Sequence, residues 1–268
     1  MLFPSSQLFL ISGPCAVEDY DSCAKVAEVL CKLREQIPGH VVFKGSFRKA
    51  NRTRSDSFAG IGDEAAIHIL GRIKEEFDLM ITTDVHQADD VAKVMDIVDV
   101  IQIPAFLCRQ TALIQRAAKT GKTVNIKKGQ FMSGEGMKYA KQKAEKAGEG
   151  EILLTERGTT FGYSDLIVDM RNIAAMTAFA TVVMDCTHAT QRPNSGAGVT
   201  GGNPLEIELL ARTGLMAGAT GLFIETHPDP ASASSDQASM LPLRELEPMI
   251  KRLLPIAELY QATYGSND

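Results

Sequence analysis

The chain has 268 residues, of which 44% are hydrophobic and 23% charged, and its net charge is −5. This length suits one α/β barrel domain of roughly 250 residues, and the apolar fraction excludes an intrinsically disordered chain. The acidic balance argues against a nucleic-acid-binding surface, which needs a basic face. It leaves room for a local cluster of cations around a small anion.

The sequence gives no sign of a membrane or secretion segment. No apolar run approaches the ~18 residues that a membrane-spanning helix needs. The short apolar run at 8–12 has no basic segment before it, unlike a signal peptide. We therefore expect a cytoplasmic protein without membrane contact. The five cysteines are odd in number and scattered, which favours free thiols over a disulfide framework.

Short apolar runs alternate with amphipathic stretches along the whole chain. The predicted strands span 8–12, 41–45, 79–85, 99–105, 123–128, 151–158, 181–188 and 221–227. Several of them are continuously apolar, as strands buried on both faces are. Helical patterns lie between the strands, and the clearest span 23–37, 64–77, 88–98, 109–121, 203–218 and 243–264.

Eight strands, each followed by helix-like sequence, predict a (β/α)8 TIM barrel that occupies residues 1–268 as a single domain. A doubly wound sheet is the alternative, but eight evenly spaced units favour closure into a ring. The segments 192–202 and 227–240 are predicted loops after the last two strands. Long loops at the carboxyl ends of barrel strands usually carry function.

Charged or coordinating side chains fall at the carboxyl end of nearly every predicted strand, where barrel enzymes have their active sites. Such groups are costly in apolar sequence unless they are paired or ligated. Converging cations suit a ligand with phosphate and carboxylate groups, which arginine can bind with two hydrogen bonds. The cationic set is Lys44, Lys49, Lys127 and Arg157. A plain surface position stays an alternative for Lys49 and for Lys128.

A second set of residues has the chemistry of a metal site. It consists of Cys15, His188 and Glu225, which Asp236 can extend. A thiolate, an imidazole and carboxylates can bind a divalent metal ion such as Zn, Fe, Mn or Co. The first, seventh and eighth strands become neighbours when the barrel closes, so distance along the chain is no obstacle. Taken singly, Cys15 can also be a core thiol and His188 a hydrogen-bonded core histidine.

Motifs in a fixed order make the chain similar to a known enzyme family. The most specific segment is FKGSFRKANRTRSDSFAG (43–60). Further matches are TDVH (83–86), DVIQIPAFLCRQTAL (99–113), NIKKGQFMS (125–133), ERGTTFGY (156–163), DCTHATQ (185–191) and IETHPDP (224–230). Over essentially its whole length the chain resembles the 3-deoxy-D-manno-octulosonate 8-phosphate synthases, also called 2-dehydro-3-deoxyphosphooctonate aldolases.

This resemblance implies a (β/α)8 barrel, usually a homotetramer, that condenses phosphoenolpyruvate with D-arabinose 5-phosphate and water. Inorganic phosphate is released, and the product feeds synthesis of the Kdo sugar of bacterial lipopolysaccharide. Residues that match the phosphoenolpyruvate site are Lys44, Ser46, Lys49, Lys127, Gln130 and Arg157. Those that match the aldose-phosphate segment are Asn51, Arg52 and Thr53, where the family pattern has Ser in place of Thr53.

The family that the chain resembles has two classes, with Cys in the motif after the first strand when a metal is required and Asn when it is not. Cys15 within SGPCAVE (12–18) implies the metal-dependent class. The remaining metal ligands of that class match His188, Glu225 and Asp236. In the predicted mechanism His188 is both ligand and proton relay. The further catalytic candidates are Asp84, His86 and Lys49.

Three other functions stay open. The related 3-deoxy-arabino-heptulosonate 7-phosphate synthases accept another aldose, such as erythrose 4-phosphate, but have a KPRTSP-like segment where this chain has KANRT (49–53). A Schiff-base aldolase would use Lys127 or Lys44 as its nucleophile, although four separated cations suit anion binding better. A non-catalytic barrel that senses a sugar phosphate or a metal is the third.

Overall fold

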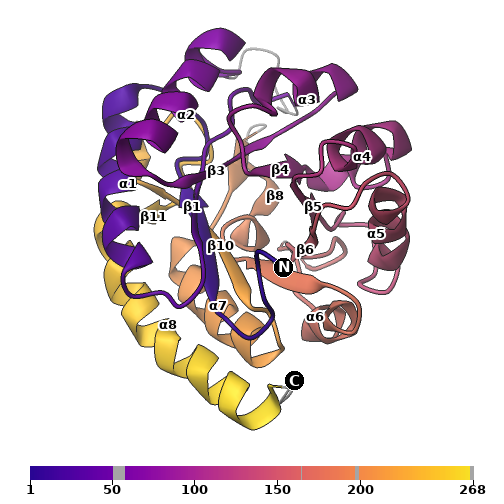
Figure 1. Ribbon diagram of the computed structural model, residues 1–268. Coiled ribbons are helices and arrows are strands. Elements are labelled where there is room, and N and C mark those ends of the chain that lie inside the picture. The colour runs from indigo at the N-terminus through magenta and orange to yellow at the C-terminus, as the bar shows by residue number, and fades with distance from the viewer. Residues whose placement is uncertain (51–57, 164, 197–198, 266–268) are drawn as a thin grey trace.

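The computed structural model describes residues 1–50, 58–163, 165–196 and 199–265, and its centre is a closed parallel barrel (Figure 1). The barrel strands of the described chain are, in order, β1 (Phe9–Gly13), β2 (Val41–Lys44), β3 (Met80–Asp84), β4 (Val100–Ile103), β5 (Thr123–Lys127), β6 (Ile152–Glu156), β7 (Thr181–Asp185) and β10 (Gly221–His227). Parallel pairing of β1 with β10 closes the ring. The predicted (β/α)8 barrel is confirmed.

Helices follow the barrel strands and surround them (Figure 1). They are α1 (Tyr20–Arg34), α2 (Asp63–Phe77), α3 (Ala88–Val94), α4 (Thr111–Ala118), α5 (Met137–Glu145), α6 (Met170–Thr177), α7 (Ile207–Met216) and α8 (Leu243–Tyr264). This arrangement buries each strand on both faces, which is why the strand sequences are continuously apolar. No helix in the described ranges is both long enough and apolar enough to cross a membrane.

Local sequence determines where helices begin. The Asp19 carboxylate accepts a hydrogen bond from the backbone N–H of Ser22 at the start of α1. Gln87 and Asp90 form a capping box at the start of α3. The amphipathic pattern at 23–37 therefore finds α1 but begins three residues late, because the cap and the first turn are polar.

The barrel has two apolar layers. One lies between strands and helices, and the other fills the barrel interior with alternate strand residues such as Phe9, Val42 and Phe223. Phe3 belongs to this inner layer, with its ring centroid 4.7 Å from that of Phe9. Since Phe9 begins β1, the amino-terminal end of the barrel is filled by apolar side chains, and the opposite end is left for polar groups.

Ordered elements that the sequence did not reveal lie within the first predicted loop and directly after the second. Within 192–202, β8 (Arg192–Gly196) pairs with β9 (Val199–Gly201) as an antiparallel hairpin. After 227–240, β11 (Leu241–Pro242) pairs with the end of β10. Sequence rich in Gly, Pro and Ser lacks the alternating apolar pattern by which short strands are recognised.

Candidate active site

A cluster of buried charged residues lies at the carboxyl ends of the barrel strands. We call it the rim cluster, and it consists of Lys44, Asp84, Lys127, Asp185 and Glu225. Because the barrel strands are parallel, their carboxyl ends meet at one end of the ring, where barrel enzymes carry their active sites. The structure therefore gathers charges that are far apart in the sequence.

Lys44 is buried, and its amino group is fully hydrogen-bonded within the protein. Its Nζ donates to the carbonyl oxygen of Cys15 at 2.8 Å, to Oγ of Ser46 at 3.0 Å and to Oε1 of Glu225 at 2.7 Å. A lysine has three N–H donors, so all are used. Ser46 in turn donates to the carboxylate of Asp84. Lys44 thus joins β1, β2, β3 and β10 at this end of the barrel.

Asp185 holds Lys127 and His188 together. Its Oδ2 lies 2.7 Å from Nζ of Lys127 and 2.8 Å from Nδ1 of His188. Burial alone would raise the pKa of Asp185, but His188 and Lys127 bring it well below its usual range. An ionised carboxylate only accepts hydrogen bonds, so it fixes the imidazole with Nδ1 protonated. The other ring nitrogen, Nε2, then lies 3.6 Å from Oε2 of Glu225.

Arg157 follows β6 directly and is buried. Its Nη2 donates to the carbonyl oxygen of His188 at 3.2 Å and to Oε1 of Gln191 at 2.8 Å. Its Nη1 is buried and has no hydrogen-bond partner among the described residues. A buried donor without an acceptor is costly, and an oxygen of an anionic ligand would satisfy it.

Gln130 is a second residue with an unused polar atom. Its Oε1 is buried without a hydrogen-bond partner in the described part of the chain. The residue lines a cavity of about 440 Å³ together with Phe131 and Thr160. Among the described residues, the hydrogen bonds and ion pairs of the rim cluster do not include Gln130.

Cys15, Glu225 and Asp236 form a group with the chemistry of a metal site. One ligand atom from each lies within 4.8 Å of the other two. The Cys15 thiol donates to Oδ2 of Asp236 at 2.8 Å, and Oε2 of Glu225 is buried with no hydrogen-bond partner in the described ranges. Burial and the carboxylates of Asp236 and Glu225 raise the pKa of Cys15. The sulfur therefore stays protonated unless a metal ion displaces the proton.

This donor set fits a divalent ion. Sulfur and carboxylate oxygens are ligands of zinc and iron, and an ion bound here would give Oε2 of Glu225 the partner that it lacks among the described residues. His188 lies at the edge of the group, since its Nε2 is near Glu225 but outside the set of mutually close atoms.

Asp84 and His86 differ in charge, since the first is an ionised carboxylate and the second a neutral imidazole. Burial would raise the pKa of Asp84, but Lys44 and Lys49 lower it overall, so the carboxylate is ionised. Burial lowers the pKa of His86, and its Nδ1 has no hydrogen-bond partner among the described residues. A neutral imidazole near an ionised carboxylate can accept a proton. Lys49, which is partly buried, also acts on the pKa of Cys15.

Three predicted substrate residues lie outside the described part of the chain, and two residues that contact the site were given no role by the sequence. Asn51, Arg52 and Thr53 lie outside the described residues. The sequence prediction assigned no role to Asp185 or Gln191, although both stand in the DCTHATQ motif. Asp185 ends an apolar strand, which is the signal that could have identified it.

We expect acid to destabilise the protein through Asp84 and Asp185. Both native pKa values lie below the ordinary 3.8 of an unfolded chain, so each carboxylate stabilises the fold above about pH 4. That contribution is lost progressively as the pH falls further. Thermal unfolding between pH 7 and pH 3 measures this loss. An Asp185→Asn variant should lose less stability over the same range, and an unchanged pH dependence would count against this explanation.

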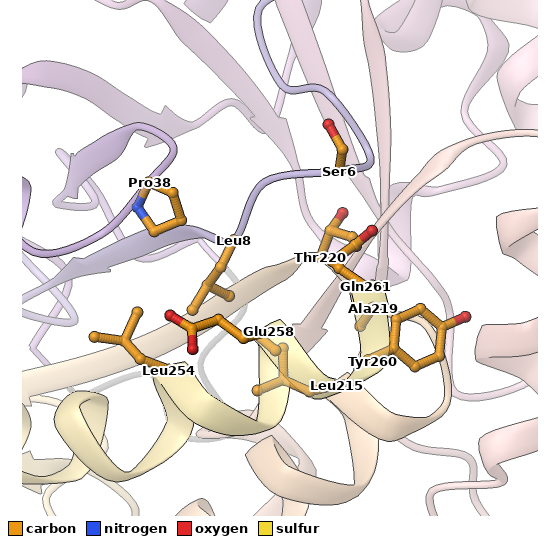
Figure 2. A pocket seen from close by; sticks show the side chains of 11 residues that line it. Ser6, Leu8, Pro38, Leu215, Ala219, Thr220, Leu254, Glu258, Tyr260 and Gln261 are labelled. Carbon is orange, nitrogen blue, oxygen red and sulfur yellow. The ribbon is translucent and has the colours of Figure 1, made fainter. Parts of the chain in front are cut away.

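A second cavity, of about 260 Å³, is lined by residues that precede β1 and β10 and by residues of α8, which places it at the barrel end opposite the rim cluster. Figure 2 shows the side chains that line it. It is lined mainly by apolar side chains, among them Leu8, Leu215 and Leu254, close to the starts of β1 and β10. None of the predicted catalytic, substrate or metal residues within the described ranges lines it. It contributes nothing to the candidate active site.

Comparison with known proteins gives a consistent family. Residues 5–260 match the DAHP synthetase I family. A 2-dehydro-3-deoxyphosphooctonate aldolase of Koribacter versatilis is 44% identical over 255 residues, which cover 94% of this chain and 92% of the relative. Proteins of the same name from Rickettsia bellii and Wolinella succinogenes are 45% and 43% identical, covering 93% and 94% of this chain and 92% and 100% of the relatives. The chain therefore belongs to the DAHP synthetase I family and has 2-dehydro-3-deoxyphosphooctonate aldolases as its relatives.

Proposed function

We propose that the protein condenses phosphoenolpyruvate with D-arabinose 5-phosphate and water to give 3-deoxy-D-manno-octulosonate 8-phosphate and inorganic phosphate, a step of Kdo and lipopolysaccharide synthesis. The name of the relatives supports this reaction. The observation that carries the proposal is the buried Nη1 of Arg157, which has no hydrogen-bond partner in the described part of the chain. It lies at the rim that also bears Lys127 and the Cys15 group.

Phosphoenolpyruvate has a carboxylate and a phosphate, which need fixed positive groups. Arg157 offers its free Nη1 to one oxyanion, and Lys127 provides positive charge nearby. Holding both anionic groups fixes the face of the enol that meets the aldehyde. The three N–H donors of Lys44 already form hydrogen bonds within the protein. Lys44 would therefore contribute its positive charge and hold Ser46 and Glu225 in place.

The reaction forms a bond between C3 of the enol phosphate and the aldehyde carbon, whose oxygen gains a proton. Water adds at C2 and loses one proton. The C2 hydroxyl group then passes its own proton to the departing phosphate as the C2–oxygen bond to phosphate breaks, which leaves a ketone. The cations of the rim stabilise the negative charge of the departing phosphate. Proton transfer falls to the neutral His86 beside Asp84 and to His188, which Asp185 orients.

The proposal includes a divalent metal ion and the metal-dependent class. Cys15, Glu225 and Asp236 would hold the ion, with His188 as the fourth ligand. When bound, such an ion polarises a carbonyl group or a water molecule. The sulfur favours zinc or iron, while manganese and cobalt also accept this combination of ligands. A homotetramer and a cytoplasmic location belong to the same proposal, and light scattering would test the tetramer.

The assay that tests this function measures inorganic phosphate released from phosphoenolpyruvate. We expect release with arabinose 5-phosphate and an eight-carbon product by mass spectrometry. Erythrose 4-phosphate as the aldose tests the seven-carbon alternative, and borohydride treatment with substrate tests a Schiff base on Lys127 or Lys44. Release with erythrose 4-phosphate alone, or covalent trapping by borohydride, would contradict the proposal.

A further inference from the structure

Lys128 is a buried lysine that takes no part in the rim cluster. It follows Lys127 at the end of β5, and its side chain is fully buried. Its Nζ lies 3.2–3.3 Å from the carbonyl oxygens of Gly129, Met132 and Gly158, and 3.3 Å from Oγ1 of Thr159. A surface position for this lysine, left open by the sequence, is therefore wrong. The ammonium group binds oxygens of two different loops.

Glu156 is the charged partner of Lys128. Its Oε1 lies 3.3 Å from Nζ of Lys128, and both side chains are inaccessible to solvent. The same oxygen accepts hydrogen bonds from the backbone N–H groups of Arg157 at 3.0 Å and Gly158 at 2.7 Å. These two N–H groups belong to the peptide bonds on either side of the Arg157 α-carbon. Glu156 thus fixes the backbone from which the Arg157 side chain projects.

The pair connects two neighbouring loops. Residues 129–132 follow β5 and residues 157–159 follow β6, and the two strands are paired. The backbone N–H of Thr160 also donates to the carbonyl oxygen of Gln130 at 3.0 Å. A buried ion pair is weak evidence for stability, because the loss of hydration offsets the attraction. A role in fixing geometry accounts better for charges in this place.

We propose that Lys128 and Glu156 are positioning residues that hold Arg157 where it binds phosphoenolpyruvate. The inference rests on the proposed function, since the ligand is the enol phosphate of that reaction. Without Lys128, the three loop carbonyls lose their donor. Burial already raises the pKa of Glu156 and Lys128 opposes that rise, so the carboxyl group would protonate and accept less strongly. A displacement of about 1 Å of a substrate-binding group is enough to weaken catalysis strongly.

The test is the double variant Lys128→Met/Glu156→Gln. It removes both charges, so no unpaired charge stays buried, and the amide oxygen can still accept from Arg157 and Gly158. We expect KM and the calorimetric Kd for phosphoenolpyruvate to rise by ~10-fold or more. KM for arabinose 5-phosphate should stay within about twofold, because the aldose segment follows β2 on another part of the ring. Circular dichroism and the melting temperature report on the fold.

An exposed ion pair provides the matched control. Lys141 and Glu145 are bonded across one turn of α5, so Lys141→Met/Glu145→Gln makes the same two substitutions away from the site. Both substrate constants should be unchanged in this control. If the buried double variant does not fold, the single Glu156→Gln variant replaces it, with a smaller rise expected for phosphoenolpyruvate alone.

The outcomes separate the two proposals. A folded variant with wild-type affinity for phosphoenolpyruvate, or an equal rise in both KM values, rejects the positioning role. Wild-type protein that binds phosphoenolpyruvate without condensing it rejects the proposed reaction, and the binding comparison still decides the role of Lys128 and Glu156. Wild-type protein that does not bind phosphoenolpyruvate rejects both.

Discussion

Replacing Arg157 by alanine should lower kcat/KM for phosphoenolpyruvate by about 100- to 1000-fold, the usual loss when one oxyanion contact is removed. The guanidinium has one nitrogen, Nη1, that no described residue satisfies, and Nη2 is held by His188 and Gln191. The two hydrogen bonds of Nη2 therefore fix the orientation of Nη1. Initial rates of phosphate release, at a temperature where circular dichroism shows a folded variant, measure the effect.

Two further variants sharpen this result. Arg157→Lys keeps the charge but loses the planar fork, so we expect an intermediate rate. Arg171→Ala removes an exposed guanidinium on α6 that pairs with Asp169, the residue before this helix, and its rate should equal that of the wild type. A wild-type rate in Arg157→Ala would contradict the proposed binding site for phosphoenolpyruvate.

Removal of divalent metal should abolish condensation, and added Zn²⁺, Fe²⁺, Mn²⁺ or Co²⁺ should restore it. The expectation follows from the close approach of the Cys15, Glu225 and Asp236 ligand atoms. It also follows from Oε2 of Glu225, which is buried without a hydrogen-bond partner among the residues that the structure describes. Because the pKa of Cys15 is raised, metal binding must release its proton. The apparent affinity for metal should therefore rise between pH 6.5 and pH 8. Full activity after exhaustive chelation would reject the metal-dependent class.

The role of the thiol itself is tested by metal content. Cys15→Ser should purify with far less metal than the wild type. The same is expected of Cys15→Asn, which introduces the residue found in the class that requires no metal. Cys31→Ser is the matched control, because Cys31 is a free, half-buried cysteine on α1 that donates to the carbonyl oxygen of Phe77. Equal metal content in the two serine variants would refute a Cys15 ligand.

The barrel was predictable because its strands are recognisable locally. Strands buried on both faces read as apolar runs, and predicted strands such as 41–45 and 123–128 lie within one residue of β2 and β5. Strand 181–188 was predicted three residues too long, because Cys186 and Thr187 are buried like strand residues although they lie beyond β7. The β8–β9 hairpin has no such pattern and was missed.

The contacts of the site were less predictable because they depend on ring closure. The hydrogen bond between Lys44 and Glu225 joins residues 181 positions apart, and no local sequence pattern predicts it. Lys127 and Lys128 are adjacent and chemically identical, yet one belongs to the rim cluster and the other binds loop carbonyls. The alternation of side chains along a strand separates them, but a sequence does not state which one faces the barrel interior.

Ring closure between β1 and β10 also bears on protein synthesis. The ribosome releases the amino-terminal side of a chain first, so Cys15 emerges before its partner Asp236, which lies 221 residues later. Contacts at such separation form slowly, because a long loop must close before they stabilise anything. A nascent chain therefore cannot assemble the Cys15–Asp236 pair before Asp236 has left the ribosome, and a metal ion held by these residues, as proposed, would bind only after that point.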